Sequence, residues 1–302
     1  MSTISVIMTD YNVEKYISMA IESILQQTFE DFEFIIVDDA STDQTYDVIC
    51  NYHDKRIIKM RNHMNLGVAA CINKGMSMVS SEFIARMDSD DISKPERFKK
   101  QLEFMYSNPN LGISGSHMEI IDDKGKLIKE HHKKISSEAI KIGLFFGHTS
   151  LAHPSIIMRR EIMDKYHLRY DTAFQYAEDY DLYCRSSSFM TLDNYPECLV
   201  QYRMRSGSVS QKYRQQQIID AQTALYLHLR RLRIPFSLED FKIHRQFAFP
   251  DKYSEFPLTE KIFDWIDYLY AWNELNEIFD RELFEKSCIQ YKDFFLQGDN
   301  VK

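Results

Sequence analysis

Short apolar runs alternate with segments of helical periodicity through the first hundred residues. Runs of β-prone residues occupy 4–8, 32–37, 56–60 and 83–87. After the first run, Ile17, Ile21, Ile24 and Leu25 recur at helical spacing, and further helices are expected near 44–52 and 68–79. Strands and helices in this rhythm predict a largely parallel sheet with right-handed crossovers. The polar turns should then meet at the carboxyl ends of the strands.

The pattern changes after residue 100. An amphipathic helix is expected from Pro95 to Tyr106, and strand-like runs recur at 112–116, 155–158 and 199–203. From about Gln211 onward the chain is mostly helical and rich in aromatic residues, with prolines at 235, 250 and 257 as expected breaks. The aromatics Phe263, Trp265, Tyr268, Tyr270 and Trp272 suit a core or a self-association surface better than sugar stacking.

The acidic tetrad Asp88-Ser89-Asp90-Asp91 closes the fourth apolar run. Three carboxylates in four residues repel one another unless a cation or hydrogen-bond donors compensate them. At the carboxyl end of a strand, they are typical of a hard divalent metal that carries phosphate oxygens. The alternative is an acidic turn that caps the following helix, which Ser93 and Pro95 would begin.

The turns after the first two strands narrow the class of protein. The first turn, Thr9-Asp10-Tyr11-Asn12, has no glycine that would let the backbone approach a pyrophosphate, which argues against a dinucleotide dehydrogenase. The glycine-rich basic turn usual in nucleotidyltransferases that make nucleotide-sugars is also missing. After the second strand, Ser41 and Gln44 match a capping box for the next helix.

Charge and cysteine usage set further bounds. The 302 residues carry a net charge of -8, which argues against nucleic acid as a partner. The stretch 205–245 is nevertheless basic, with eight Lys/Arg against three Asp/Glu, and could meet anionic lipid headgroups or phosphorylated sugars, or be a solvated helix face. Five scattered cysteines without a Cys-x-x-Cys pair indicate a reducing compartment and no zinc site. With no signal-peptide pattern and no apolar run near the ~18 residues of a bilayer span, a cytoplasmic or peripheral membrane location is expected.

An ordered series of motifs resembles the family-2 glycosyltransferases. Its members are Ser5-Val6-Ile7-Met8-Thr9-Asp10-Tyr11-Asn12, Val37-Asp38-Asp39-Ala40-Ser41-Thr42-Asp43, Asn65-Leu66-Gly67, Ala85-Arg86-Met87-Asp88-Ser89-Asp90-Asp91 and Ala177-Glu178-Asp179. The resemblance covers about residues 1–210. It implies inverting, metal-dependent chemistry and the A-type glycosyltransferase fold, a Rossmann-like α/β domain whose mostly parallel central sheet is flanked by helices. We expect a nucleotide-binding half at 1–100, an acceptor and catalytic half at 101–210, and a helical C-terminal region at 211–302.

Further motifs narrow the resemblance. Together with Ala177-Glu178-Asp179-Tyr180, the segments 194–197 (Asn-Tyr-Pro-Glu) and Tyr202-Arg203 look most like bacterial enzymes that extend lipooligosaccharide or capsule glycans, above all N-acetylhexosamine transferases. This implies transfer from UDP-GlcNAc or UDP-GalNAc to a glycan or glycolipid, at the cytoplasmic face of the inner membrane. A UDP-galactose or UDP-glucose transferase, and a noncatalytic glycan- or nucleotide-binding protein, remain alternatives. Oligomeric state is left open.

The resemblance assigns the nucleotide site residue by residue. Thr9 and Tyr11 match residues that line the uridine, and Asp39 matches the carboxylate that accepts a hydrogen bond from the uracil imide. A carboxylate suits that task because the imide of uracil is a donor. Asn12, Asn65 and Gly67 complete the predicted nucleotide-binding set. For Asp38, a cap or solvated turn is the preferred reading.

The tetrad is expected to handle the diphosphate. By resemblance, Asp90 coordinates Mn²⁺ or Mg²⁺ directly, while Asp88 approaches the ribose or a metal-bound water. Asp91 is expected to cap the following helix instead. Arg86 either neutralises the pyrophosphate or ties the tetrad in place.

Asp179 matches the base of the family, which takes the proton of the attacking acceptor hydroxyl. Glu178 is expected to orient the acceptor or cap the helix, and Asp181 to point elsewhere. His153 could wall the sugar pocket or be structural. One departure concerns Arg205, which occupies the place where many relatives carry a histidine that contacts metal or diphosphate. Because arginine holds phosphate through paired hydrogen bonds, we expect Arg205 to grip the diphosphate.

Overall fold

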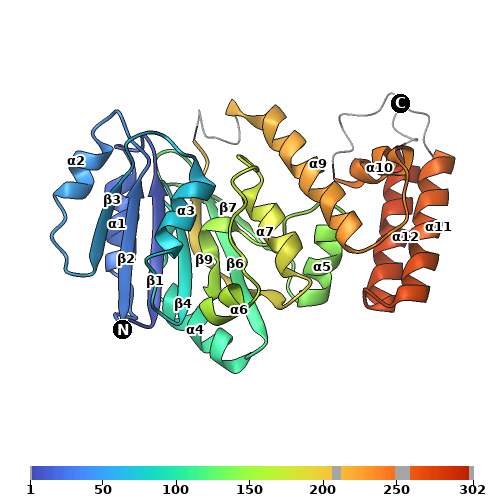
Figure 1. The fold of residues 1–302 in the computed structure, drawn as a ribbon, viewed down its shortest axis with the longest axis horizontal. Helices are drawn as coiled ribbons and strands as arrows, with labels where there is room; N and C mark the ends of the chain where they lie inside the picture. Colours follow the sequence, from blue (N-terminus) through green and yellow to red (C-terminus); the bar gives the residue numbers. More distant parts are fainter. Residues whose placement is uncertain (1, 206–211, 249–258, 299–302) are drawn as a thin grey trace.

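A nine-stranded sheet forms the centre of the computed structural model, which describes residues 2–205, 212–248 and 259–298 (Figure 1). The strands are β1 (Ile4–Asp10), β2 (Phe32–Asp38), β3 (Ile57–Arg61), β4 (Phe83–Asp88), β5 (Ile92–Ser93), β6 (Leu111–Ile121), β7 (Leu127–His131), β8 (Ile157–Arg159) and β9 (Thr191–Arg203). Their order is β3-β2-β1-β4-β8-β6-β9-β5, with β7 paired to β6.

Helices surround this sheet and continue beyond it. Those of the first two hundred residues are α1 (Ile17–Leu25), α2 (Thr45–Cys50), α3 (Val68–Met76), α4 (Arg97–Ser107), α5 (Ser137–Phe145), α6 (Arg160–Lys165) and α7 (Glu178–Ser186), with a 3₁₀ turn η1 at His153–Ser155. The C-terminal part consists of α9 (Arg214–Arg231), α10 (Leu238–His244), the 3₁₀ turn η2 (Arg245–Phe247), α11 (Thr259–Asn276) and α12 (Arg281–Gly298).

Strand β1 is buried on both faces, which explains its unbroken apolar sequence. Ile4, Val6 and Met8 pack with the apolar residues of α1 and α4, while Ile7 packs with Ile72 and its neighbours on α3. The alternation of side chains along a strand therefore divides β1 between two helical layers.

The sheet is mixed. Strands β3, β2, β1 and β4 are parallel, as the alternating pattern predicts, and β6 and β9 form a second parallel pair. Strand β8 lies antiparallel between β4 and β6 and joins the two parallel parts. This architecture confirms the predicted α/β fold with a mostly parallel central sheet, flanking helices and a helical C-terminal part.

The C-terminal helices share a hydrophobic core with the sheet domain. One cluster of buried residues runs from Tyr183 on α7 through Leu229 on α9 to Leu269 on α11 and Phe284 on α12. Figure 1 shows α10, α11 and α12 at the end of the molecule opposite β3, and α9 reaching back toward α7. Trp265 belongs to this core at 5% exposure. The proposed division at residue 210 stays a prediction.

Two capping predictions are wrong. Ser41 and Gln44 form no capping box, because the Oδ1 of Asp43 accepts the Thr45 N–H at 3.0 Å and Ser41 Oγ instead accepts the Asn12 N–H at 3.0 Å. Asp91 does not cap α4, whose N-cap is Glu96.

The sequence analysis also assigned no structure to β7, α5 or α6. Pro250 and Pro257, expected as helix breaks, lie outside the described residues. Within the described helices, none is both long and apolar enough to cross a membrane.

Candidate active site

Strand register brings the predicted site residues together at one edge of the sheet. Thr9 at the end of β1 is the register partner of Asp88 at the end of β4, and Asp10 is the partner of Asp38 at the end of β2. Because the strands are parallel, their carboxyl ends meet at this edge, as expected for an α/β ligand site. Residues up to eighty positions apart thereby form one surface.

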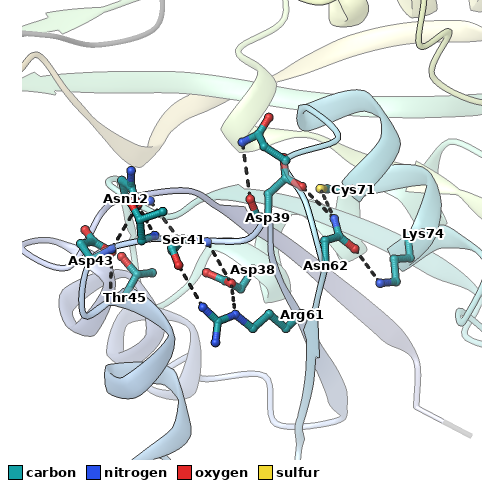
Figure 2. Close-up of polar contacts among 12 residues, drawn as sticks. Asn12, Asp38, Asp39, Ser41, Asp43, Thr45, Arg61, Asn62, Cys71 and Lys74 are labelled. Atoms are coloured by element: carbon teal, nitrogen blue, oxygen red, sulfur yellow. Dashed lines mark hydrogen bonds and ion pairs between the residues drawn. The ribbon is translucent and has the colours of Figure 1, made fainter.

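Asp39 organises the loop 65–67. Its Oδ1 accepts the Leu66 N–H and the Asn62 side-chain amide, each at 2.8 Å, and its Oδ2 accepts the Gly67 N–H at 2.8 Å (Figure 2). Gly67 has φ 86° and ψ 162°, a backbone conformation that residues with a Cβ rarely adopt. Three donors keep Asp39 ionised and leave part of Oδ2 for a further donor, as the predicted contact with uracil requires.

Asn12 joins the turns after β1 and β2. Its Oδ1 accepts the Thr42 N–H at 2.8 Å, and its backbone has φ 53° (Figure 2). The side chain of Tyr11 is 47% exposed and therefore open to a ligand, whereas Thr9 is buried. Asn65 donates to the Asp39 carbonyl at 3.4 Å. The chain itself thus uses Asn12 and Asn65 to shape the turns, and their contact with a nucleotide stays a prediction.

Asp10 and Asp38 form a buried acidic pair that the sequence analysis did not identify. Arg61 and the Ser41 N–H bind Oδ2 of Asp38, at 3.1 and 3.2 Å. Its Oδ1 and both oxygens of Asp10 have no hydrogen-bond partner within the described chain. Burial, and then the neighbouring Asp38, raise the pKa of Asp10 to about 9. Asp10 therefore holds a proton at neutral pH and can donate it to Asp38, which is not the solvated turn or helix cap expected for that residue.

A signal for this pair was present in the sequence. Asp10 is the last residue of a fully apolar run, and the adjacent strand ends on Asp38. Only the register decides that the two face each other.

Three arginines compensate the tetrad. Arg86 forms an ion pair with Asp88, and Arg205 Nε donates to Asp90 Oδ2 at 2.6 Å. The Arg203 N–H donates to Asp91 Oδ1 at 2.8 Å, while the Arg203 Nε donates to the carbonyl of Asp90 at 2.8 Å. Asp91 is thus a buried anchor between β4 and β9.

The carboxylates present fit a metal that also binds substrate. Among the described residues, no group of three or more His, Cys, Asp or Glu could hold a metal ion alone. Asp88 and Asp90 offer two hard carboxylates at the strand edge, and Mg²⁺ is commonly held by one or two carboxylates plus substrate phosphates. The donor set is therefore suitable for Mn²⁺ or Mg²⁺ only together with a phosphorylated ligand.

Arg86 connects the tetrad with the predicted base. Its side chain is 2% exposed, and besides Asp88 it acts electrostatically on Glu178 and Asp179 at the start of α7. Burial raises the pKa of Asp179, which suits a base, and raises that of Glu178 to about 8, with Asp179 as the next cause. This position supports the tying role for Arg86 over a direct grip on pyrophosphate.

His153 lies behind Glu178. Its Nε2 is 2.8 Å from the hydroxyl of Tyr170, and its Nδ1 is 4.0 Å from Glu178 Oε1. Burial, and then Arg86, hold the pKa of His153 well below its usual range, so the ring is neutral. Asp181 faces away from the site, paired with Arg185 at 2.7 Å and Arg231 at 3.4 Å, as predicted.

A cavity of about 280 Å³ lies beside Asp179. Tyr176 and Asp179 line one side, and Arg214, Gln217 and Ile218 of α9 line another. The sequence analysis assigned none of these α9 residues to the site. No periodic signal could have found them, because the approach of α9 to α7 is a tertiary contact.

Comparison with known proteins gives a consistent result. The family model described as "Glycosyl transferase family 2" matches residues 5–167. The O-antigen biosynthesis glycosyltransferase WbnJ of Escherichia coli is 32% identical over 218 residues, which cover 68% of this chain and 81% of WbnJ. From the same species, the UDP-Glc:alpha-D-GlcNAc-diphosphoundecaprenol beta-1,3-glucosyltransferase WfgD is 28% identical over 60% of this chain and 68% of its own.

Among solved structures, S. aureus TarS 1-349 in complex with UDP-GlcNAc has a similar fold. The TM-score is 0.66 at 20% identity, over 89% of this chain and 80% of that one.

Proposed function

The chain belongs to glycosyltransferase family 2, and from this premise we propose that it transfers GlcNAc or GalNAc from its UDP-sugar to a glycan acceptor with inversion. The observation that carries the proposal is the position of Arg86. This buried arginine faces Asp88 on one side and the Glu178–Asp179 pair on the other, so the diphosphate side and the base side form one site. The UDP-GlcNAc complex of TarS, which has a similar fold, supports the choice of donor.

The proposed reaction is a single displacement. The acceptor hydroxyl oxygen attacks C1 of the donor sugar as the bond from C1 to the diphosphate oxygen breaks, and the configuration at C1 inverts. Asp179 takes the hydroxyl proton, and UDP leaves with the bonding electrons. The raised pKa of Asp179 favours proton uptake, because a stronger base drives transfer further in the transition state.

Each end of UDP has proposed contacts. Asp39 accepts the imide N–H of uracil, Tyr11 covers the base, and Thr9, Asn12, Asn65 and Gly67 shape the turns around it. Asp88 approaches the ribose or a metal-bound water. Mn²⁺ or Mg²⁺, held by Asp90 with Asp88, would offset the negative charge of the departing diphosphate.

Arg205 adds a second cation at the diphosphate. Its guanidinium already lies against Asp90, so a small side-chain movement suffices to reach a neighbouring phosphate oxygen. An arginine there can form paired charged hydrogen bonds with phosphate. Glu178, with a pKa of about 8, is protonated at neutral pH and could donate to an acceptor or donor sugar oxygen, while His153 supports it from behind.

The acceptor proposed is a growing bacterial surface glycan or its lipid-linked precursor. WbnJ is named for O-antigen biosynthesis, and WfgD for a diphosphoundecaprenol-linked acceptor, which supports this class. A lipid-linked acceptor would bring the protein to the cytoplasmic face of the inner membrane as a peripheral partner. Because WfgD is named for UDP-Glc, transfer of glucose or galactose is the alternative within the family.

UDP release from a panel of UDP-sugars, with and without Mn²⁺, tests the proposal. The native protein should turn over one N-acetylhexosamine donor in a metal-dependent way. Asp179→Asn should lower turnover by about 10²–10⁴-fold, the usual contribution of a general base, and Asp90→Ala should abolish metal dependence. Asp293→Asn, an exposed change on α12, is the matched control. Turnover that survives Asp179→Asn would exclude Asp179 as the base, and binding of UDP without turnover would favour the noncatalytic alternative.

A further inference from the structure

The cavity beside Asp179 points to the chemistry of the acceptor. This step rests on the proposed function, because it takes Asp179 as the base and therefore its cavity as the acceptor side. The volume of about 280 Å³ equals roughly nine waters at ~30 Å³ each, which is room for one sugar ring. Its far wall is the first two turns of α9, outside the matched segment 5–167.

The cavity is preformed. Asp220 on α9 is buried, and its Oδ2 accepts the N–H groups of Gln175 and Tyr176 at 3.0 and 3.1 Å. Gln216 donates to the other carboxylate oxygen at 2.8 Å. The ring of Tyr176 stacks on Tyr213 with centroids 4.7 Å apart and planes 14° apart. These contacts fix the segment before Asp179 against α9, so a ligand need not organise it.

Arg214 is the basic residue of the cavity lining. It is exposed, and no carboxylate among the described residues pairs with it; in particular, it forms no ion pair with Asp179 across the cavity. Arg214 is also the first residue of α9, whose first turn holds no acidic residue. A cation at a helix N-terminus is disfavoured by the helix dipole, and an anion there is favoured. An anionic ligand beside Arg214 would resolve this conflict.

Two further cations lie near the same cavity. Lys133 acts electrostatically on Asp179, and Lys212 lies 5.1 Å from the ring centroid of Tyr213, which stacks on Tyr176. The only other charged group lining the cavity is Asp179 itself. The surroundings of one sugar ring are therefore basic, although the whole chain carries a net charge of -8.

We propose that the acceptor carries an anionic group on or directly attached to the sugar that is glycosylated, and that Arg214 binds this group. The anion could be a phosphate that links the sugar to its carrier, or the carboxylate of a uronic acid. Both present oxygens that a guanidinium holds through paired hydrogen bonds. A neutral sugar would leave Arg214 at the cavity without a partner.

Binding to the native protein saturated with UDP tests this without turnover. Three probes are titrated by calorimetry: octyl α-GlcNAc as the neutral sugar, 11-phenoxyundecyl-diphosphate α-GlcNAc as the phosphate arm, and octyl glucuronide as the carboxylate arm. At least one anionic probe should bind tenfold or more tightly than the neutral probe. Preference for the diphosphate assigns a carrier-linked phosphate, and preference for the glucuronide assigns a uronic acid.

Variants on one helix separate the role of Arg214 from general charge. Arg214→Gln should weaken the preferred anionic probe at least tenfold and bring it close to the neutral probe, and Arg214→Lys should restore part of the difference. Arg230→Gln removes an exposed charge from the same helix and should change neither Kd.

Several outcomes overturn the inference. They are equal affinity for neutral and anionic probes, an equal effect of Arg214→Gln on both, or no binding of any probe while UDP binds. Failure to bind UDP or any UDP-sugar would instead refute the proposed function, so the two failures are distinguishable.

Discussion

Arg205 donates from its Nε to Oδ2 of Asp90 at 2.6 Å, so an arginine neutralises the carboxylate proposed to bind metal. Both side chains are only about one-fifth exposed, at 20% and 21%, which strengthens their attraction relative to a surface pair. The guanidinium also lies 5.5 Å from the centroid of the Tyr16 ring, a cation–π distance. Arg205 is therefore held by two partners on the diphosphate side of the site.

The first prediction is that Arg205 competes with a divalent cation for Asp90. Removing it in Arg205→Gln should strengthen Mn²⁺ binding to the nucleotide-free protein about tenfold, because a charged hydrogen bond contributes roughly 1.5–3 kcal/mol. Electron paramagnetic resonance of free Mn²⁺ measures this directly. The same variant should raise the KM for the UDP-sugar, since a phosphate partner is lost. Unchanged Mn²⁺ affinity together with an unchanged KM would contradict both roles.

The second prediction concerns the proton shared by Asp10 and Asp38. With a folded pKa of about 9 against about 3.8 unfolded, Asp10 binds more protons in the folded state between these values. Stability therefore falls as pH rises through this window, by up to ~4 kcal/mol between pH 3.8 and 7 as an upper bound. The nearby Asp39 and Asp43 add repulsion of the same sign.

Asp10→Asn keeps a neutral donor toward Asp38 but removes the ionisation. The variant should be more stable than the native protein at pH 8, by about 1–3 kcal/mol, with a smaller difference at pH 5.5. Urea denaturation at the two pH values measures this. Asp31→Asn, an acidic change at the opposite end of the sheet, serves as the control. A native-like pH slope in Asp10→Asn would show that Asp10 is already ionised at neutral pH.

The third prediction concerns acid stability. His228 on α9 is fully buried, and burial lowers its pKa to about 3; neither ring nitrogen has a hydrogen-bond partner within the described chain. Its unfolded form takes up a proton below pH ~6.5, whereas the folded form does not, so stability falls as pH drops from 6.5 toward 3.

His228→Leu should flatten this loss and stabilise the protein by about 1–3 kcal/mol at pH 5, because it also removes unpaired buried nitrogens. Thermal unfolding between pH 7 and 4.5 follows the effect. His53→Gln, which changes an exposed histidine, should retain the native slope. If His228→Leu is as acid-sensitive as the native protein, His228 does not limit acid stability.

The fourth prediction tests the loop held by Asp39. Gly67→Ala has open space for its Cβ but forces alanine into φ 86°, ψ 162°, at a cost of about 1–3 kcal/mol. The loop should relax by breaking the bond from the Gly67 N–H to Asp39, and the Kd for UDP should rise severalfold. Met64→Ala, in the same loop but 66% exposed, should leave stability unchanged. UDP affinity equal to that of the native protein in Gly67→Ala would separate this loop from the nucleotide site.

Local patterns in the sequence were sufficient for the elements that make the nucleotide half. Apolar runs and helical spacing identify β1 to β4 and their helices, because both faces of these strands are buried and the pattern reports burial directly. The same reasoning failed at the start of α2, where Ser41 and Gln44 satisfy the capping rule but Asp43 forms the bond. Several nearby side chains could cap the same N–H, and only the path of the loop selects one.

The sequence by itself determined which carboxylates stand at the ends of β4 and at the start of α7, and hence the family chemistry. Only the tertiary structure decided which charges face one another: Asp10 with Asp38, Arg205 with Asp90, Arg86 between Asp88 and Asp179, and Arg214 beside the cavity. The physical reason is that electrostatic interaction depends on distance and burial, and neither follows from spacing along the chain once strands pair and α9 packs on α7.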